Sequence, residues 1–130
     1  MAVGILLVTH PGVGNALLAV AAQLLRPLPL SVETFEVPFE TEPEGLLPSA
    51  SAAVRRLDTG DGVLVLTDLY GASPSNLAHR ISHLGGDVHR VSALSLPMLL
   101  RVLNYAERDV NELATIAAAG ARNGVVVDDA

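Results

Sequence analysis

Short aliphatic runs alternate along the chain with segments in which apolar residues recur at helical spacing. The runs at residues 3–8, 63–67 and 88–94 predict strands buried on both faces of a sheet. Residues 31–37 alternate between apolar and polar and predict a weaker, edge strand. Helices are predicted at residues 16–25, 46–57, 74–84, 98–106 and 110–121.

The alternation of strands and helices predicts the fold class. It indicates an α/β protein with a three-layer, doubly wound, mostly parallel sheet, helices on both faces and right-handed crossovers. Residues 1–130 suit one domain. A last aliphatic run at residues 125–127 predicts a short terminal strand that lacks a partner in this pattern. We expect it to pair at a sheet edge, with a second subunit as a candidate. Residues 38–48, rich in Pro and Glu, predict a loop.

Composition narrows the class of protein. Half of the residues are hydrophobic, but no run approaches the ~18 apolar residues of a spanning helix, and the N-terminus lacks the basic start of a signal peptide. The formal net charge of −6, with no Lys, argues against nucleic acid and anionic membranes as partners. The absence of Cys excludes disulfides and Cys-ligated metals. We therefore expect a soluble, cytoplasmic protein.

Polar residues follow three of the predicted strands. His10 follows the first, Asp68 the third and Ser95 the fourth, and the carboxyl ends of parallel strands form the usual ligand site. A carboxylate that accepts one ring N–H fixes the histidine tautomer and stabilises the cation that forms on attack. Asp68 can serve His10 in this way; if it holds Nδ1–H, then Nε2 is the attacking atom.

Two loops next to this cluster open predicted helices. Residues 12–15 and 73–76 would present backbone N–H groups and a partial positive charge, which suit a phosphoryl group. Ser73 and Asn76 add side-chain donors. The residues therefore indicate a site for phosphoryl transfer to and from His10. Each residue alone also has a plainer interpretation: His10 as a loop residue, Asp68 as a turn cap, and Ser73 as a helix cap before Pro74.

Other motifs are absent or weak. There is no phosphate-binding or dinucleotide-binding glycine pattern and no nucleophile elbow. His79 and His83 have the spacing of metal ligands on a helix, but no third ligand is evident, so we expect them to face solvent and predict no metal site. Five acids occur in one short stretch that we expect to lie away from His10: Glu33, Glu36, Glu40, Glu42 and Glu44.

Three blocks resemble the IIA component of the mannose/fructose/sorbose-type bacterial phosphotransferase system. They are residues 4–10, ending in Thr9-His10, residues 62–76, with Asp68 and the loop Gly-Ala-Ser-Pro-Ser-Asn, and residues 96–99, Leu-Pro-Met-Leu. The blocks occur in the family's order and spacing and cover nearly the whole chain. The middle block is the most specific.

The resemblance implies a mechanism without metal or organic cofactor. The phosphocarrier HPr would phosphorylate His10, and a IIB protein would take the group on for sugar uptake. Asp68 matches the orienting position, and the loop around Gly71, Ala72 and Ser73, with Asn76 in the same motif, matches the phosphate cradle. Thr9 and Ser95 would support the site. Members of the family are homodimers that exchange a C-terminal strand, which would give residues 125–127 a partner.

The chain departs from the family pattern at four positions. Ala72 replaces a Gly, Ser75 a Phe and Ser95 an Asn, and Pro11 follows His10 where Gly or Ser is common. Pro11 removes one N–H and restricts His10 to extended backbone angles. These departures affect the expected choice of partner and the transfer rate more than the identity of the nucleophile.

Three other functions are compatible with parts of the sequence. One is a regulatory protein whose His10 phosphorylation state controls a partner, without a cognate permease. Another is the related phosphotransfer subunit of dihydroxyacetone kinase, although the middle block fits the sugar-type family better. The last is a flavodoxin-like flavin binder, which the 3% aromatic content disfavours because few rings could stack on a flavin.

Overall fold

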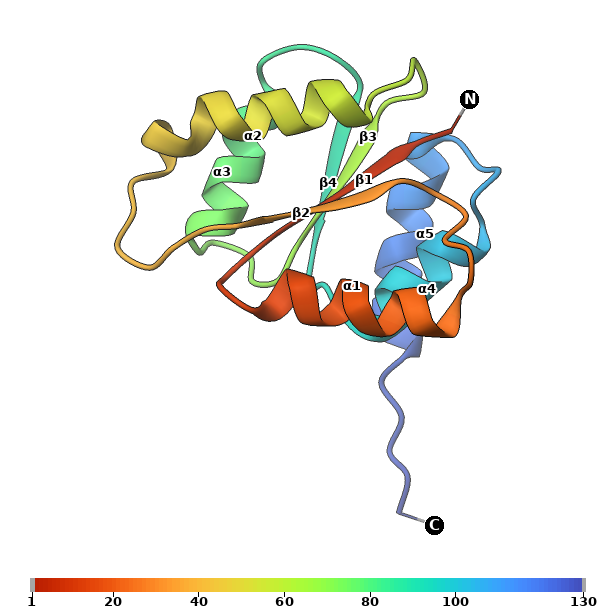
Figure 1. Cartoon of the computed structure of the whole chain (residues 1–130). Coiled ribbons are helices and arrows are strands. Elements are labelled where there is room, and N and C mark those ends of the chain that lie inside the picture. Colours follow the sequence, from red (N-terminus) through yellow and green to blue (C-terminus); the bar gives the residue numbers. More distant parts are fainter. Residues whose placement is uncertain (1, 130) are drawn as a thin grey trace.

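The computed structural model describes residues 2–129, which form one parallel sheet with helices on both faces (Figure 1). The elements in chain order are β1 (Gly4–Thr9), α1 (Val13–Leu24), β2 (Val32–Glu36), α2 (Pro43–Leu57), β3 (Val63–Thr67), α3 (Ser73–Ser82), β4 (Val88–Ser92), α4 (Leu96–Asn104) and α5 (Val110–Asn123). All strand pairs are parallel, in the order β2-β1-β3-β4. The predicted fold class is confirmed.

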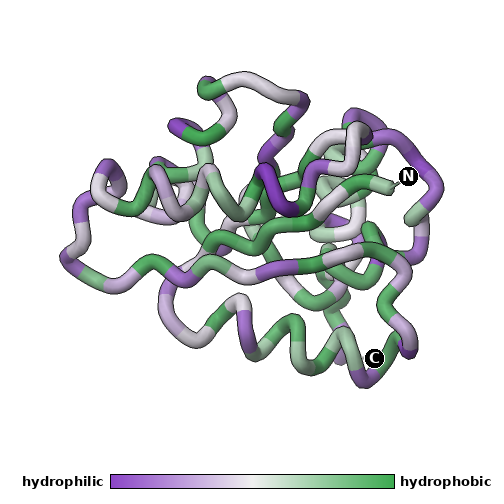
Figure 2. Tube along the Cα trace, turned by 45° about the horizontal axis from the view of Figure 1, so that its top comes forward, coloured by the Kyte–Doolittle hydropathy of each residue, from purple (hydrophilic) through white to green (hydrophobic). Residues whose placement is uncertain are grey.

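The alternation of side chains along the strands divides the core into two halves. Ile5 and Leu7 of β1 face α1, α4 and α5, whereas Leu6 and Val8 face α2 and α3. β1 and β3 are buried throughout because helices cover both faces and strands flank both edges. Hydrophobic residues accordingly concentrate along the central strands, and polar residues on the outer turns (Figure 2).

β4 differs from the prediction of a third central strand. It lies at the edge of the sheet, with residues that are half-buried or exposed. Its polar residues His89, Arg90 and Ser92 explain this position, because a strand with one neighbouring strand keeps one edge in contact with solvent. The prediction of an edge strand at residues 31–37 is confirmed by β2.

Two helices begin earlier than the pattern predicts, and each has a proline in its first turn. α2 begins at Pro43 rather than residue 46, and continues through Pro48, so only residues 38–42 of the predicted loop are loop. α4 begins at Leu96, with Pro97 in its first turn. Proline is tolerated in a first helical turn because the N–H groups there have no intrahelical acceptor.

Residues 125–127 do not form the predicted terminal strand within this single chain. They extend beyond α5 with exposed side chains, and the tail points away from the sheet (Figure 1). A strand needs a neighbouring strand to satisfy its backbone groups, and the tail reaches neither edge of its own sheet. Among the described residues, none of the helices is long and apolar enough to cross a membrane.

Candidate functional site

His10 and Asp68 meet at the carboxyl edge of the sheet, as predicted. β1 and β3 are neighbours with Val8 opposite Thr67, so the residues that follow the two strands lie side by side. Asp68 Oδ2 accepts the backbone N–H of His10 at 3.0 Å and lies 2.9 Å from its Nδ1. The two side chains are 26% and 12% exposed. The histidine is therefore held at two points yet reachable from solvent.

This geometry distinguishes the two ring nitrogens of His10. An ionised carboxylate only accepts hydrogen bonds, so Nδ1 carries the proton in the contact with Asp68. Nε2 then keeps its lone pair and has no hydrogen-bond partner among the described residues. The other carboxylate oxygen, Asp68 Oδ1, is buried and also lacks a partner within residues 2–129.

Thr9 fixes the backbone that carries His10. Its buried hydroxyl donates to the carbonyl of His10 at 2.9 Å and accepts the N–H of Gly14 at 2.9 Å. A Cβ at position 14 would lie 3.0 Å from this hydroxyl, so glycine permits the close approach. Thr9 thus ties the end of β1 to the start of α1.

The N-terminus of α1 offers fewer free N–H groups than we expected at residues 12–15, because three of the four are already bonded. The N–H of Val13 donates to the His10 carbonyl, and that of Ala16 to the Gly12 carbonyl. The N–H of Gly14 donates to the Thr9 hydroxyl, and that of Asn15 to the Glu36 carboxylate. Glu36 lies opposite Thr9 in the pairing of β1 with β2, which brings it to this helix. The prediction that the acidic stretch lies away from His10 is therefore wrong for Glu36.

The N-terminus of α3 remains open. A turn closed by the N–H of Ala72 on the carbonyl of Leu69 (3.3 Å) leads into it, with Gly71 at φ 87°, the left-handed conformation that a type II turn requires. The backbone N–H groups of Ser73 and Ser75 donate no hydrogen bond among the described residues. An anion would find these donors free.

Ser73 is the first residue of α3, not its cap as predicted. The cap is Ala72, and no side chain hydrogen-bonds the helix start. The Ser73 hydroxyl is consequently available, and Asn76 is exposed in the first turn with its backbone N–H on the carbonyl of Ala72 (3.0 Å). Both residues present polar side chains beside the open N–H groups.

The Ser95 side chain makes its hydrogen bond within its own segment of the chain. Its hydroxyl accepts the N–H of Met98 at 3.3 Å and caps α4. The hydrogen bonds of residues 2–129 tie it to α4 and not to His10 or Asp68. The structure thus accounts for Ser95 as a helix cap.

Phe39 is a site neighbour that the sequence analysis missed. Its ring centroid lies 5.6 Å from that of His10, with 34° between the ring planes. The N–H of Val37 donates to the carbonyl of Thr9 at 2.8 Å, so the loop after β2 starts beside His10. The predicted edge strand could have given the signal, because a strand that pairs with β1 delivers its following loop to the same sheet edge.

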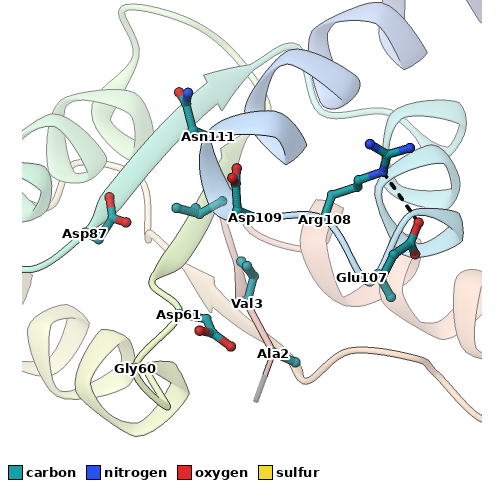
Figure 3. Close-up of a pocket in the computed structure, with 11 residues that line it drawn as sticks. Ala2, Val3, Gly60, Asp61, Asp87, Glu107, Arg108, Asp109 and Asn111 are labelled. Carbon is teal, nitrogen blue, oxygen red and sulfur yellow. Dashed lines mark ion pairs between the residues drawn. The ribbon is translucent and has the colours of Figure 1, made fainter.

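The candidate metal pair and the hollow of Figure 3 lie apart from His10. The ring centroids of His79, in the last turn of α3, and His83, its C-cap, lie 4.5 Å apart with a tilt of 49°. Partial desolvation and the charges of Arg90, His83 and Arg80 lower the pKa of His79. No group of three His, Asp or Glu within residues 2–129 could hold a metal ion. A hollow of about 410 Å³ lies at the opposite end of the sheet (Figure 3); its carboxylates are Asp61, Asp87, Glu107 and Asp109.

Fold and site together define a doubly wound α/β protein with a carboxylate-held histidine at the carboxyl edge of its sheet. The chain belongs to the EIIA-man family, described as the PTS system fructose IIA component, whose family model matches residues 4–119. The family resemblance of the three sequence blocks is therefore confirmed. Proteins of this family are components of the sugar phosphotransferase system, which supports a phosphotransfer role.

Curated relatives agree with the family. The chain is 32% identical over 127 residues to the PTS system mannose-specific EIIAB component of Escherichia coli K12 and to that of Shigella flexneri. Each match covers 96% of this chain but only 39% of the relative. The chain thus spans well under half the length of these proteins.

Solved structures share the fold. A mannose/sorbose-specific IIA subunit from Enterococcus faecalis superposes with a TM-score of 0.87 at 22% identity, covering 100% of this chain and 97% of that one. A PTS IIA protein associated with the fucose utilization operon of Streptococcus pneumoniae gives 0.78 at 25% identity, covering 98% and 96%.

Proposed function

We propose that this chain relays a phosphoryl group through His10, accepting it from an HPr-type phosphocarrier and passing it to a IIB protein for sugar uptake and phosphorylation. The observation that carries the proposal is the double hold of Asp68 Oδ2 on His10, at 3.0 Å from its backbone nitrogen and 2.9 Å from Nδ1. This hold leaves Nε2 as the exposed nucleophile.

The proposed step needs only side chains and backbone dipoles. The Nε2 lone pair forms the bond to phosphorus, while the bond from phosphorus to the donor's nitrogen breaks and its electron pair stays with the donor ring. The proton on Nδ1 remains between His10 and Asp68, whose charge stabilises the imidazolium. The open N–H groups at the start of α3, with Ser73 and Asn76, would receive the phosphoryl oxygens.

Several wider properties belong to the same proposal. We infer that residues 1–130 form one IIA domain that works in the cytoplasm without a metal or organic cofactor. The exposed residues 125–127 and the open edge of β4 support a homodimer that exchanges its C-terminal strands.

Phosphorylation in vitro tests the relay. With phosphoenolpyruvate, enzyme I and HPr, the wild type should acquire one acid-labile phosphate, and His10→Ala should acquire none, because Nε2 is the proposed nucleophile. His83→Ala, which removes the exposed histidine that caps the C-terminus of α3, is the matched control and should label like the wild type. Undiminished acid-labile phosphate on His10→Ala would contradict the proposal.

A further inference from the structure

Phe39 occupies an unusual position for a large apolar side chain. It is 71% exposed, so its own burial contributes little to folding, yet its ring lies 5.6 Å from the imidazole of His10. The next residue, Glu40, has φ 61°, a left-handed conformation that non-glycine residues rarely adopt. A strained backbone beside a reactive group suggests that the loop is held there for a functional reason.

The face of an aromatic ring attracts a cation that lies within about 6 Å of its centroid. The separation and the 34° tilt bring the Phe39 ring and the imidazole within this range. We infer that Phe39 is a positioning residue: it lies beside the imidazole of His10, restrains the ring that Asp68 holds at Nδ1, and stabilises the positive charge that the ring gains. This inference rests on the proposed phosphorylation of His10.

The charge arises in a balanced step. With phosphoramidate as a small donor, the Nε2 lone pair bonds to phosphorus, the bond from phosphorus to the amine nitrogen breaks, and ammonia leaves with the electron pair. Nδ1 keeps its proton, so the phosphorylated ring is cationic where the free ring was neutral. Phe39 thus interacts more strongly with the product and the transition state than with the free histidine.

The test uses phosphoramidate because this donor has no protein surface to dock on Phe39. At one fixed phosphoramidate concentration, Phe39→Leu should lower the labelling rate constant of His10 by about two- to fivefold, the range of an exposed cation–π contact. Phe39→Tyr and Phe39→Trp should restore the rate, because they restore an aromatic face. Tyr105→Leu, a change at a partly exposed aromatic residue at the end of α4, should leave it unchanged.

Proton NMR of the unphosphorylated protein gives a second readout. The His10 ring protons, assigned by their loss in His10→Ala, should lie upfield in the wild type and move downfield in Phe39→Leu. An unchanged labelling rate in Phe39→Leu would overturn the inference, as would unchanged His10 resonances. A wild type that phosphoramidate labels but HPr does not would contradict the relay, while the phosphoramidate rates still decide the role of Phe39.

Discussion

At the scale of single residues, one carboxylate oxygen organises the histidine. Asp68 Oδ2 receives two hydrogen bonds from His10, one from its backbone and one from its ring. An asparagine keeps the size and one acceptor but lacks the negative charge. Hydrogen bonds to charged groups contribute about 1.5–3 kcal/mol, so we expect Asp68→Asn to slow phosphoryl transfer by roughly 10- to 100-fold.

The measurement for Asp68→Asn is rapid-quench labelling with phosphorylated HPr, alongside thermal unfolding. The variant should stay folded, because the contact between Asp68 and His10 lies beyond the carboxyl ends of the strands and not in either half of the core. Transfer at the wild-type rate would show that Asp68 is not the orienting group.

A substitution at Asn76 should change the stability of the fold and the rate of phosphoryl transfer in opposite directions. Asn76→Asp is nearly isosteric and places a negative charge in the first turn of α3, where the helix dipole favours it by about 0.3–1 kcal/mol. The same charge would repel an incoming phosphoryl group. We therefore expect a higher free energy of unfolding in urea together with slower labelling of His10. Faster labelling would contradict the proposal that the phosphoryl group rests on this helix start.

The pairing of His10 with Asp68 could be predicted because both residues end buried, neighbouring strands. Phe39 and Glu36 could not be assigned in the same way. Their place next to His10 depends on the order of the strands, which puts β2 beside β1, and on the side of the loop that faces the histidine. The prediction of Ser73 as the cap was wrong by one residue: Ala72 has the extended backbone of a cap, and no side chain caps this helix, so the preference of Ser for the cap position did not decide where α3 begins.

At the scale of elements, the close approach of α2 to β1 depends on a residue without a side chain. A Cβ on Gly4 would lie 2.6 Å from the carbonyl oxygen of Leu57 and 2.7 Å from its Cβ. The contact is with the end of α2 rather than a flexible side-chain tip, so strand and helix must separate. We expect Gly4→Ala to lower the free energy of unfolding by about 1–3 kcal/mol, measured by urea denaturation.

Gly45→Ala is the control for that measurement. Gly45 lies exposed in α2, and a Cβ there would meet nothing within 4 Å. Alanine should raise the stability by about 0.5–1 kcal/mol, because it restricts the unfolded chain. Equal effects of the two substitutions would show that the contact between Gly4 and Leu57 does not limit how closely α2 packs.

At the scale of the whole molecule, the hydrophobic pattern predicts the α/β class but not which strands are at the edge. The run at residues 88–94 looks central because Val88, Val91 and Leu94 are apolar, whereas the fold gives β4 a single neighbouring strand. The sequence pattern shows how apolar a strand is, not what covers it. An edge strand that a second subunit covers can need the same apolar residues as a strand inside the sheet. The wrong prediction of a central position for β4 is therefore a reason to examine the oligomeric state.

The proposed strand exchange would bring the C-terminal tail of one copy to the open edge of β4 in the other. The tail presents Val126 at 74% exposure, followed by Asp128 and Asp129, and β4 carries His89 and Arg90. An apolar strand with an acidic end could therefore pair with an edge strand that bears the cation of Arg90.

Sedimentation velocity tests this exchange. The full chain should sediment as a dimer, and a chain truncated before Val125 should sediment as a monomer. Val126→Pro should weaken the dimer without shortening the tail, because proline cannot donate to a strand ladder, whereas Val126→Ile should preserve it. Truncation acts on a segment outside both halves of the core, so circular dichroism of the monomer should stay that of a folded protein. A truncated chain that remains dimeric would refute strand exchange and would require the two copies to meet through another surface.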